Sequence, residues 1–431
     1  MSLDGHSSGD ASPAMALRAL AAGKPPSSAC GGRFFFGREA ALALLERDLS
    51  AAENGRGAIR LIVGEHGAGK TALLHELLHR ARKKRFVTMH VDVSRDCLLW
   101  GREGEARSLL EQALLNMRTL GCGDRSAMDS LVGGFRDECD LTGRNTHSER
   151  TTVFHKQLAP LAELPRGYDF TRILGSYGEA LGANDEAAIA KARRWLLAQH
   201  RLDSEARQEV GATAISDAEQ WTMIKSWARF ARLAGRPGLV LVIDELRLVA
   251  NLAKPARDAN YAQLFRIFNE VLSGEASGLS LLIAATPAAA WKDYDSLCSE
   301  AGLSSCLHAG KAVGEATNVV EPLAFQIADL DYEDIEAMLL ALRELLGEAS
   351  PEARLIPASD IAALIEQSRD QLGGQAYPLP RDLIRLFLQL HNRLAANPSL
   401  QWTDVLQGDV RNARSVAALA AASGEFAEHM M

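Results

Sequence analysis

The chain has 431 residues, of which 47% are apolar and 24% charged, and its formal net charge is −8 at pH 7. This balance is typical of a protein with a substantial hydrophobic core. The acidic net charge argues against a globally basic, nucleic-acid-coating protein, although a local basic patch stays open. Its six cysteines form no C-x-x-C pair, which argues against a zinc site and a small disulfide framework and favours a reducing cytosol.

No apolar run approaches the roughly 20 residues that a bilayer-spanning helix needs. The chain starts with MSLDGHSSGDASPAM, which lacks a basic segment followed by an apolar core. We therefore expect a cytoplasmic protein with no signal peptide and no membrane contact.

The elements expected in the first part of the chain lead from an arm into a sheet. Residues 1–33 are rich in Gly, Ser, Pro and Ala, with one helix-like piece, PAMALRALAAG, and predict a flexible or docking N-terminal arm. Helical spacing begins at Ala40. A strand at 59–63, a glycine-rich turn with an amphipathic helix, and a second strand at 85–93 follow.

The middle of the chain changes character. Residues 100–235 carry helical patterns broken by glycine-containing loops and predict a helical insertion. Strands are then expected at 239–243 and 279–287, with a helix at 260–274 between them. Alternating apolar strands and helices predict a parallel sheet flanked by helices.

The rest of the chain, from residue 331 onward, reads as helical. The sequence therefore predicts the α/β fold of a P-loop NTPase, with an ATPase core at 34–320, a helical lid at 321–395 and a tail at 396–431.

The turn after the first strand fits G-x-x-x-x-G-K-[S/T], the P-loop. Its glycines allow backbone N–H groups to wrap around phosphates, and the helix that follows adds its positive end. Lys70 is expected to reach the β- and γ-phosphates of ATP, and the Thr71 hydroxyl to bind Mg²⁺. An ordinary glycine turn is the alternative, which the flanking strand and helix disfavour. The residues expected to hold the nucleotide here are Gly64, Glu65, His66, Gly67, Ala68, Gly69, Lys70, Thr71 and Ala72.

The apolar strand LVLVIDE ends in two acidic residues. Asp244 is expected at the carboxyl edge of a central strand, where it would complete the Mg²⁺ shell. Glu245 is suited to polarise the attacking water as a general base. A helix cap is the alternative for this pair.

Three further positions are expected to sense the nucleotide. Thr286, at the end of the strand SLLIAATP, could contact the γ-phosphate or simply cap the strand before a proline. Arg381 begins a strongly amphipathic helix and could reach the phosphates from the lid, or remain a solvated first-turn residue. Gly37 and Arg38, in FFFGRE, could pack near the adenine and its neighbouring phosphates.

These pieces, in this order over residues 34–395, resemble an AAA+ ATPase of the branch close to origin-recognition and signalling ATPases. More narrowly, the chain is similar to the P-loop ATP-binding proteins of BREX phage-defence islands, the BrxD-like family. The segments that carry this resemblance are RALAAGKPP, FFFGRE, ARRWLLAQ, PGLVLVIDELRLV, RDANYAQLFRIFNEVLSG, LLIAATPAAAWKD and PLPRDLIRLFLQL. It implies a role in bacterial phage defence beside a nucleic-acid-directed partner such as a helicase, methyltransferase or nuclease.

The chain departs from that family's pattern at one place. The family tends to carry an arginine in the loop after the threonine strand, suited to reach a neighbouring subunit, whereas residues 293–311 contain none. An arginine finger can be worth ~10³–10⁵ in rate. Another donor such as Arg257 or Arg247 could replace it, or hydrolysis is slow. Both arginines could equally be surface or helix-packing residues.

Two basic segments, HRARKKR at 79–85 and KARRW at 191–195, could contact nucleic acid. The first could equally complement the negative end of the P-loop helix. In the second, Trp195 is more typical of a core.

The sequence thus predicts a cytoplasmic Mg–ATP-dependent ATPase that regulates a partner, with nucleotide-dependent homo-oligomers as one consequence. The alternative is a nucleotide-gated switch that binds ATP or ADP and hardly turns over. A DNA-remodelling clamp loader is a third hypothesis, which would require a continuous basic groove.

Overall fold

The computed structural model describes residues 12–26, 35–121, 126–140, 147–292, 296–299, 301–307, 322–350, 352, 354–371, 377 and 379–405. Most of the predicted arm and tail lie outside these residues, as do 293–295, 300 and 308–311 of the arginine-lacking loop.

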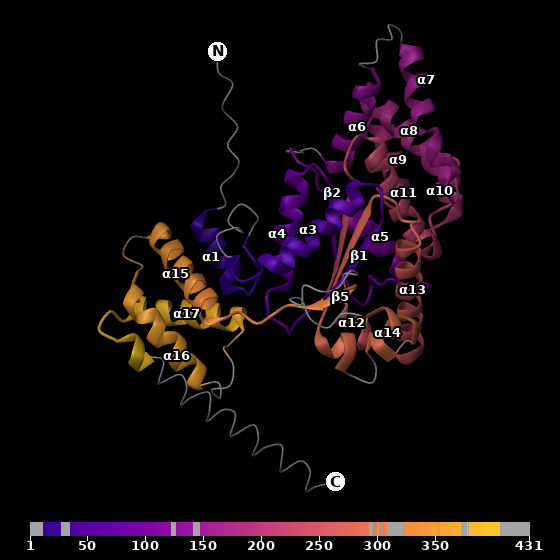
Figure 1. The fold of residues 1–431 in the computed structure, drawn as a ribbon. Coiled ribbons are helices and arrows are strands. Elements are labelled where there is room, and N and C mark those ends of the chain that lie inside the picture. Colours follow the sequence, from indigo (N-terminus) through magenta and orange to yellow (C-terminus); the bar gives the residue numbers. More distant parts are fainter. Residues whose placement is uncertain are drawn as a thin grey trace, which may run out of the picture. The chain divides into compact units, whose positions relative to one another are not determined.

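The sheet has five strands in the order β2-β3-β4-β1-β5, and every neighbouring pair is parallel (Figure 1). The strands are β1 (Ala58–Val63), β2 (Val87–Asp92), β3 (Leu239–Asp244), β4 (Leu279–Ala285) and β5 (Ala324–Gln326). The three inner strands are buried along their whole length, which is why their sequences are continuous apolar runs rather than alternating ones. The sequence predicted the first four strands; β5, only three residues long, gave no signal.

Helices account for most of the remaining described residues. They are α1 (Pro13–Ala21), α3 (Glu39–Glu53), α4 (Lys70–Lys83), α5 (Glu105–Leu115), α6 (Ala127–Asp140), α7 (His147–Leu158), α8 (Gly167–Ala183), α9 (Glu186–Leu196), α10 (Asp203–Val210), α11 (Gln220–Leu233), α12 (Arg247–Ala250), α13 (Lys254–Leu272), α14 (Ala301–Leu307), α15 (Tyr332–Ala349), α16 (Ile361–Gln371) and α17 (Pro380–Ala396). Among the described residues, none of these helices is both long and apolar enough to cross a bilayer.

The chain divides into two compact units, each with a core of its own. The smaller unit comprises the described residues of Met1–Glu39, His66–Glu76 and Ala328–Met431, and the larger unit those of Ala40–Glu65 and Leu77–Ile327. In the smaller unit, the N-terminal helix α1 packs with α15 and α17, because Ala16 and Leu20 are buried in the same apolar cluster as residues of α15, α16 and α17.

In the larger unit, the predicted insertion is helical and shares one core with the sheet. Helix α11 packs on β3 and α5 packs on β2, while α6 to α9 pack on one another (Figure 1). Aromatic side chains join these layers: the Phe230 ring lies 5.6 Å from that of Phe135 and 5.8 Å from that of Trp227. The insertion is therefore built onto the sheet through a continuous apolar core.

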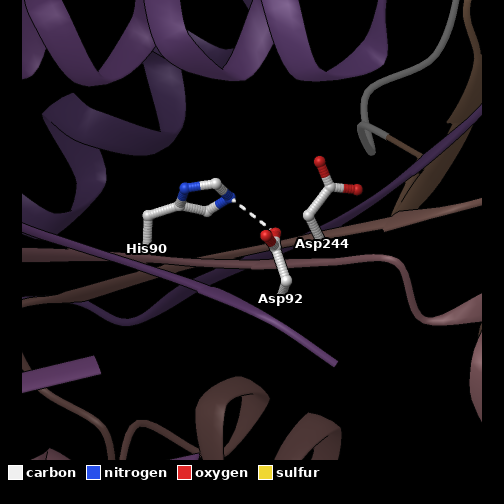
Figure 2. A group of neighbouring side chains, drawn as sticks. All are labelled: His90, Asp92 and Asp244. Carbon is white, nitrogen blue, oxygen red and sulfur yellow. Dashed lines mark ion pairs between the residues drawn. The ribbon is translucent and has the colours of Figure 1, made fainter. Parts of the chain in front are cut away.

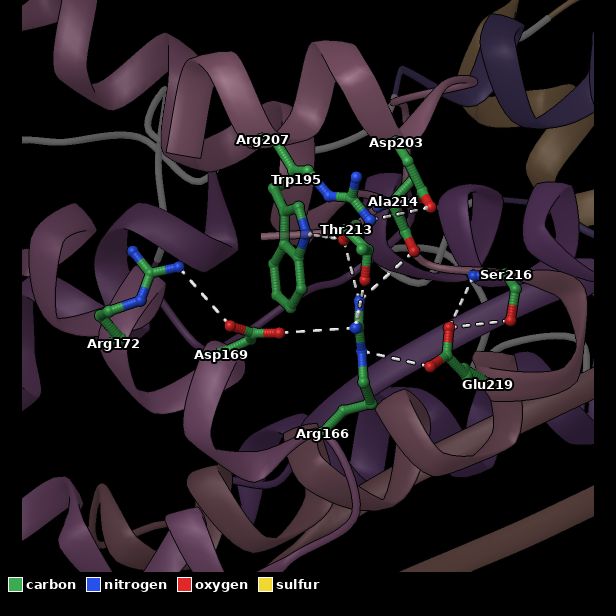
Figure 3. Close-up of polar contacts among 10 residues, drawn as sticks. All are labelled: Arg166, Asp169, Arg172, Trp195, Asp203, Arg207, Thr213, Ala214, Ser216 and Glu219. Atoms are coloured by element: carbon green, nitrogen blue, oxygen red, sulfur yellow. Dashed lines mark hydrogen bonds and ion pairs between the residues drawn. The ribbon is translucent and has the colours of Figure 1, made fainter. Parts of the chain in front are cut away.

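A single arginine fastens several insertion helices together (Figure 3). Arg166, which precedes α8, donates to the Thr213 carbonyl at 2.9 Å and forms ion pairs with Asp169 and Glu219. Its guanidinium lies over the ring of Trp195, whose indole N–H donates to the same Thr213 carbonyl at 2.8 Å. These contacts join the starts of α8 and α11 to the end of α9, because one guanidinium offers five donors in a fixed plane.

A buried ion pair connects α3 to the first strand. Arg60 is the one charged residue of β1, and its Nε donates to Asp48 Oδ2 of α3 at 2.9 Å. The same guanidinium donates to the Pro322 carbonyl just before β5. Both charged side chains are less than a tenth exposed, so each depends on the other for solvation.

Replacing Arg60 with Met should lower the free energy of unfolding by about 3–5 kcal/mol, because a buried carboxylate keeps its charge when the guanidinium is gone. Arg80→Met is the matched control. It removes the half-exposed pair between Arg80 of α4 and Glu46 of α3, the helix that also carries Asp48, and this loss should cost less than about 1 kcal/mol. Urea denaturation of both variants measures the difference. Equal losses would contradict the role assigned to the buried pair.

Candidate nucleotide-binding site

The carboxyl edge of the sheet collects the segments that the sequence predicted to be functional. β1, β4 and β3 are parallel neighbours, so the segments that follow these three strands leave the sheet at the same edge. Gly64, the first P-loop residue, donates its N–H to the Ala285 carbonyl at 3.2 Å, and Leu246 donates to the Ala284 carbonyl at 3.2 Å. The start of the P-loop and the residue after Glu245 are thereby tied to consecutive carbonyls of one strand.

The P-loop has the backbone that its glycines predict. Gly67 and Gly69 both have φ near +98°, a conformation that side-chain-bearing residues rarely adopt. Helix α4 begins at Lys70, and its first helical bond runs from the Leu73 N–H to the Gly69 carbonyl. Lys70, Thr71 and the following Ala72 are therefore the first three residues of a helix whose N–H groups are suited to bind an anion.

Arg38 braces the P-loop from the segment before α3. Its Nη2 donates to the Ala68 carbonyl at 3.0 Å, and its Nη1 donates to the Ala328 carbonyl. The side chain is buried, and burial lowers the pKa of this guanidinium, an effect that the carboxylate of Asp334 offsets in part. Gly37 is required beside it, since at its φ of +62° a Cβ atom would collide with the Asp334 carboxylate.

Arg381 also lies on the P-loop. It is the second residue of α17, its backbone N–H approaches the Gly67 carbonyl at 3.4 Å, and its guanidinium contacts Nε2 of His66. A Cβ added at Gly67 would lie 3.2 Å from Cβ of Arg381. From the sequence, Arg381 is expected to reach the phosphates from the predicted lid. In the smaller unit, Arg381 contacts the loop that is predicted to hold those phosphates.

The Asp-Glu pair occupies a strained turn. Asp244 is the last residue of β3 and is buried, and its Oδ1 accepts the Glu245 N–H at 2.7 Å. Glu245 has φ +58°, in the left-handed region, which costs a non-glycine residue about 1–3 kcal/mol. Its Oε2 lies 2.7 Å from Nε of Arg247. The general-base role predicted for Glu245, like the Mg²⁺ role of Asp244 with Thr71, stays a prediction.

Thr286 follows β4 directly, at the edge where Asp244 also ends its strand. Its carbonyl accepts the Ala290 N–H at 2.9 Å, and its Oγ1 lies 3.4 Å from the Ala289 nitrogen, a weak contact. The weak contact does not fix the hydroxyl firmly, and the nucleotide-sensing role of Thr286 stays a prediction.

The two arginines considered as replacement fingers are engaged within the chain. Arg247 pairs with Glu245, and the Arg257 side chain on α13 is only 10% exposed. A finger must reach a neighbouring subunit, so this burial disfavours Arg257 for that role.

The basic segment at the end of α4 is partly used inside the chain. Arg80 pairs with Glu46 at 3.1 Å, whereas Lys83 and Lys84 are exposed. Three basic residues lie in the last turn of α4, where cations complement the negative end of a helix.

The other basic segment, KARRW, makes several contacts within the chain. Arg193 forms an ion pair with Asp129 at 2.8 Å and Arg194 one with Glu209, while Trp195 is fully buried. Both arginines are therefore engaged by carboxylates within the chain, which disfavours them as nucleic-acid contacts.

One feature of this edge was missed by the sequence reasoning. His90 and Asp92 on β2 lie beside Asp244, and atoms of the three side chains could ligate one ion (Figure 2). The signal was present, because two polar residues alternate with apolar ones at the end of an otherwise buried strand.

A model of the family described as BREX system ATP-binding protein BrxC/D matches residues 12–410. The chain belongs to this family. The resemblance to BREX ATP-binding proteins predicted from the sequence is thereby confirmed, and ATP is supported as the ligand. Among curated proteins, none matches the chain. As a BrxC/D family member, the chain is an ATP-binding protein of a phage-defence system.

For this BrxC/D family member, Arg38→Ala should weaken ATP binding about tenfold, or about 1.4 kcal/mol. The reason is that the Ala68 carbonyl of the P-loop loses the charged donor that holds it. Titration with a fluorescent ATP analogue measures this. Arg47→Ala removes an exposed arginine from α3, the helix that follows Arg38, and should leave the affinity unchanged. An unaltered affinity in Arg38→Ala would show that the brace is dispensable.

Proposed function

We propose that the chain is a Mg–ATP-dependent ATPase of the AAA+ type that acts as a nucleotide-driven regulator in a BREX complex. The observation that carries this proposal is the convergence of two arginines on the P-loop backbone. Arg38 donates to the Ala68 carbonyl and Arg381 contacts His66 and Gly67, and both come from the unit that contains the lid helices. A change in the backbone conformation of the loop on phosphate binding would therefore alter the contacts of both arginines.

The proposed binding roles follow from the donor types. Lys70 neutralises the β- and γ-phosphates, and backbone N–H groups of the loop hold their oxygens. Mg²⁺ prefers oxygen ligands, which the Thr71 hydroxyl and the Asp244 carboxylate offer. When bound, Mg²⁺ supplies charge neutralisation to the transferred phosphoryl group.

Hydrolysis in this proposal depends on Glu245. The Glu245 carboxylate follows Asp244, the proposed Mg²⁺ ligand. From there it can accept a proton from water and direct that water at the γ-phosphate. Thr286, at the same sheet edge, is proposed to detect the γ-phosphate, and Arg381 to convert its presence into a movement of the lid helix α17. Gly37 and Arg38 are proposed to support the loop beside the nucleotide.

Steady-state ATP hydrolysis of the full chain, with and without duplex DNA, tests this function. Glu245→Gln should lower kcat by about 10²–10⁴, because general-base assistance is lost while the side-chain volume is kept. ATP binding by Glu245→Gln should persist, whereas Lys70→Ala should lose it.

Turnover that matches the Glu245→Gln background, with ATP still bound by the wild type, would rule out autonomous hydrolysis. Stimulation by DNA would support coupling to DNA, for which the exposed Lys83 and Lys84 are the candidate contacts. The charge-reversed Lys83→Glu/Lys84→Glu variant should abolish that stimulation without changing basal turnover.

A slow nucleotide-gated switch is the second candidate function, and one contact favours it. The Glu245 carboxylate is held by Arg247 at 2.7 Å, which directs it away from the role of a free base. The burial of Arg257 and the arginine-lacking loop at 293–311 also remove two sources of an arginine finger from this chain. A partner protein would then have to supply the charge.

Arg247→Ala should raise kcat about two- to fivefold if this pair restrains Glu245, because a half-exposed ion pair is worth roughly 0.4–1 kcal/mol. Lys254→Ala, which removes an exposed pair with Asp258, is the matched control and should not alter kcat. Both are measured in the same ATPase assay. A fall in kcat would instead make Arg247 a residue that hydrolysis requires.

The proposed setting is the bacterial cytoplasm, with a helicase, methyltransferase or nuclease of the defence complex as the regulated partner. Nucleotide-dependent homo-oligomers are part of the ATPase proposal, whereas the switch hypothesis expects a stable monomer or dimer.

A further inference from the structure

His90, Asp92 and Asp244 form a cluster because of the strand register. Asp92 of β2 is the register partner of Asp244 of β3, so both side chains project from the same face of the sheet. His90 lies two residues before Asp92 and therefore also shares that face. Figure 2 shows the imidazole and the two carboxylates grouped together, with His90 and Asp92 joined as an ion pair.

The spacing suits a divalent cation. One ligand atom from each of the three residues lies within 4.8 Å of the others, and His90 Nε2 is 3.3 Å from Asp92 Oδ1. Bonds of about 2.1 Å place ligands on opposite sides of an octahedral ion about 4.2 Å apart and adjacent ones nearer 3 Å. Small side-chain rotations on two hydrogen-bonded strands would therefore be enough to close the site.

The exposure of the three groups is graded. Asp244 is 3% exposed, whereas the side chains of His90 and Asp92 are 24% and 66% exposed. A cation can therefore approach from solvent past Asp92 and meet a buried carboxylate, where the lower dielectric strengthens the attraction. An imidazole binds a metal in its neutral form, so the metal-bound set of two carboxylates and one imidazole would carry a charge of −2, which matches a divalent ion.

We propose that His90, Asp92 and Asp244 bind a first-row divalent transition ion of the Mn²⁺ and Zn²⁺ class in the absence of nucleotide. An imidazole nitrogen among carboxylate oxygens selects such ions over Mg²⁺, which prefers an all-oxygen shell. Binding at this site requires neither ATP nor hydrolysis. Its consequence, that these residues influence which metal accompanies ATP at Asp244, rests on the proposed function.

The test is a Mn²⁺ titration of nucleotide-free, full-length protein, followed by the electron paramagnetic resonance signal of unbound Mn²⁺. Wild-type protein should bind Mn²⁺ at least about tenfold more tightly than Mg²⁺, as measured by competition. His90→Gln and Asp92→Asn should each weaken Mn²⁺ binding at least about tenfold. His155→Gln is the matched control, because it removes an imidazole that also contacts a carboxylate, that of Glu179 at 2.6 Å.

Lys70→Ala separates this inference from the proposed function, since it should lose ATP binding and retain Mn²⁺. Equal Mn²⁺ affinity in wild type and His90→Gln would overturn the inference and leave His90 and Asp92 as an ion pair only. If His90→Gln does not fold, protection of the wild-type imidazole decides: Zn²⁺ should shield His90, but not His155, from diethyl pyrocarbonate. Modification of His90 at an unchanged rate would overturn the site.

Discussion

Parallel pairing of β1, β4 and β3 is the constraint on which the rest of this structure depends. Because these strands run in one direction, the P-loop, Thr286 and the Asp244–Glu245 pair all leave the sheet at its carboxyl edge. Hydrogen bonds from Gly64 and Leu246 to consecutive carbonyls at the end of β4 fix the relative register of the departing segments. The strands that lead to this edge are buried along their whole length, and packed strands are better suited than loops to position polar groups.

Several buried arginines of this structure are solvated by backbone carbonyls as well as by carboxylates. The guanidinium of Arg60 is tolerated in a buried strand because it donates hydrogen bonds to Asp48 and to a backbone carbonyl. The guanidinium of Arg38 is likewise buried against the P-loop, where it donates to two backbone carbonyls. In both cases the guanidinium links segments distant in the chain through its fixed fork of donors. Arg166 performs the same task in the helical insertion. Arginine thus joins separate elements of the chain where apolar packing alone would leave carbonyls unsatisfied.

The acidic end of β3 combines two different electrostatic environments. Asp244 is buried and close to His90 and Asp92, which gives it the surroundings of a metal ligand. Glu245, one residue later, turns through a left-handed backbone conformation and pairs with Arg247 near the surface. Neighbouring carboxylates with such different surroundings can hold separate roles, one toward a cation and the other toward a proton. Membership of the BrxC/D family gives these features a setting in ATP binding.

The sequence by itself determined the α/β class, four of the five strands, the glycine turn between β1 and α4 and the family, because glycines at fixed spacing and continuous apolar runs are local signals. It also placed Trp195 in the core. Only tertiary structure decided which arginines are engaged: Arg193 and Arg194 form internal ion pairs, and Arg257 is buried. The cluster of His90 with Asp92 and Asp244 likewise depends on the register between β2 and β3, which joins residues far apart in the chain. Strand pairing and side-chain partners are set by the packing of distant segments, and that information is not contained in any local pattern.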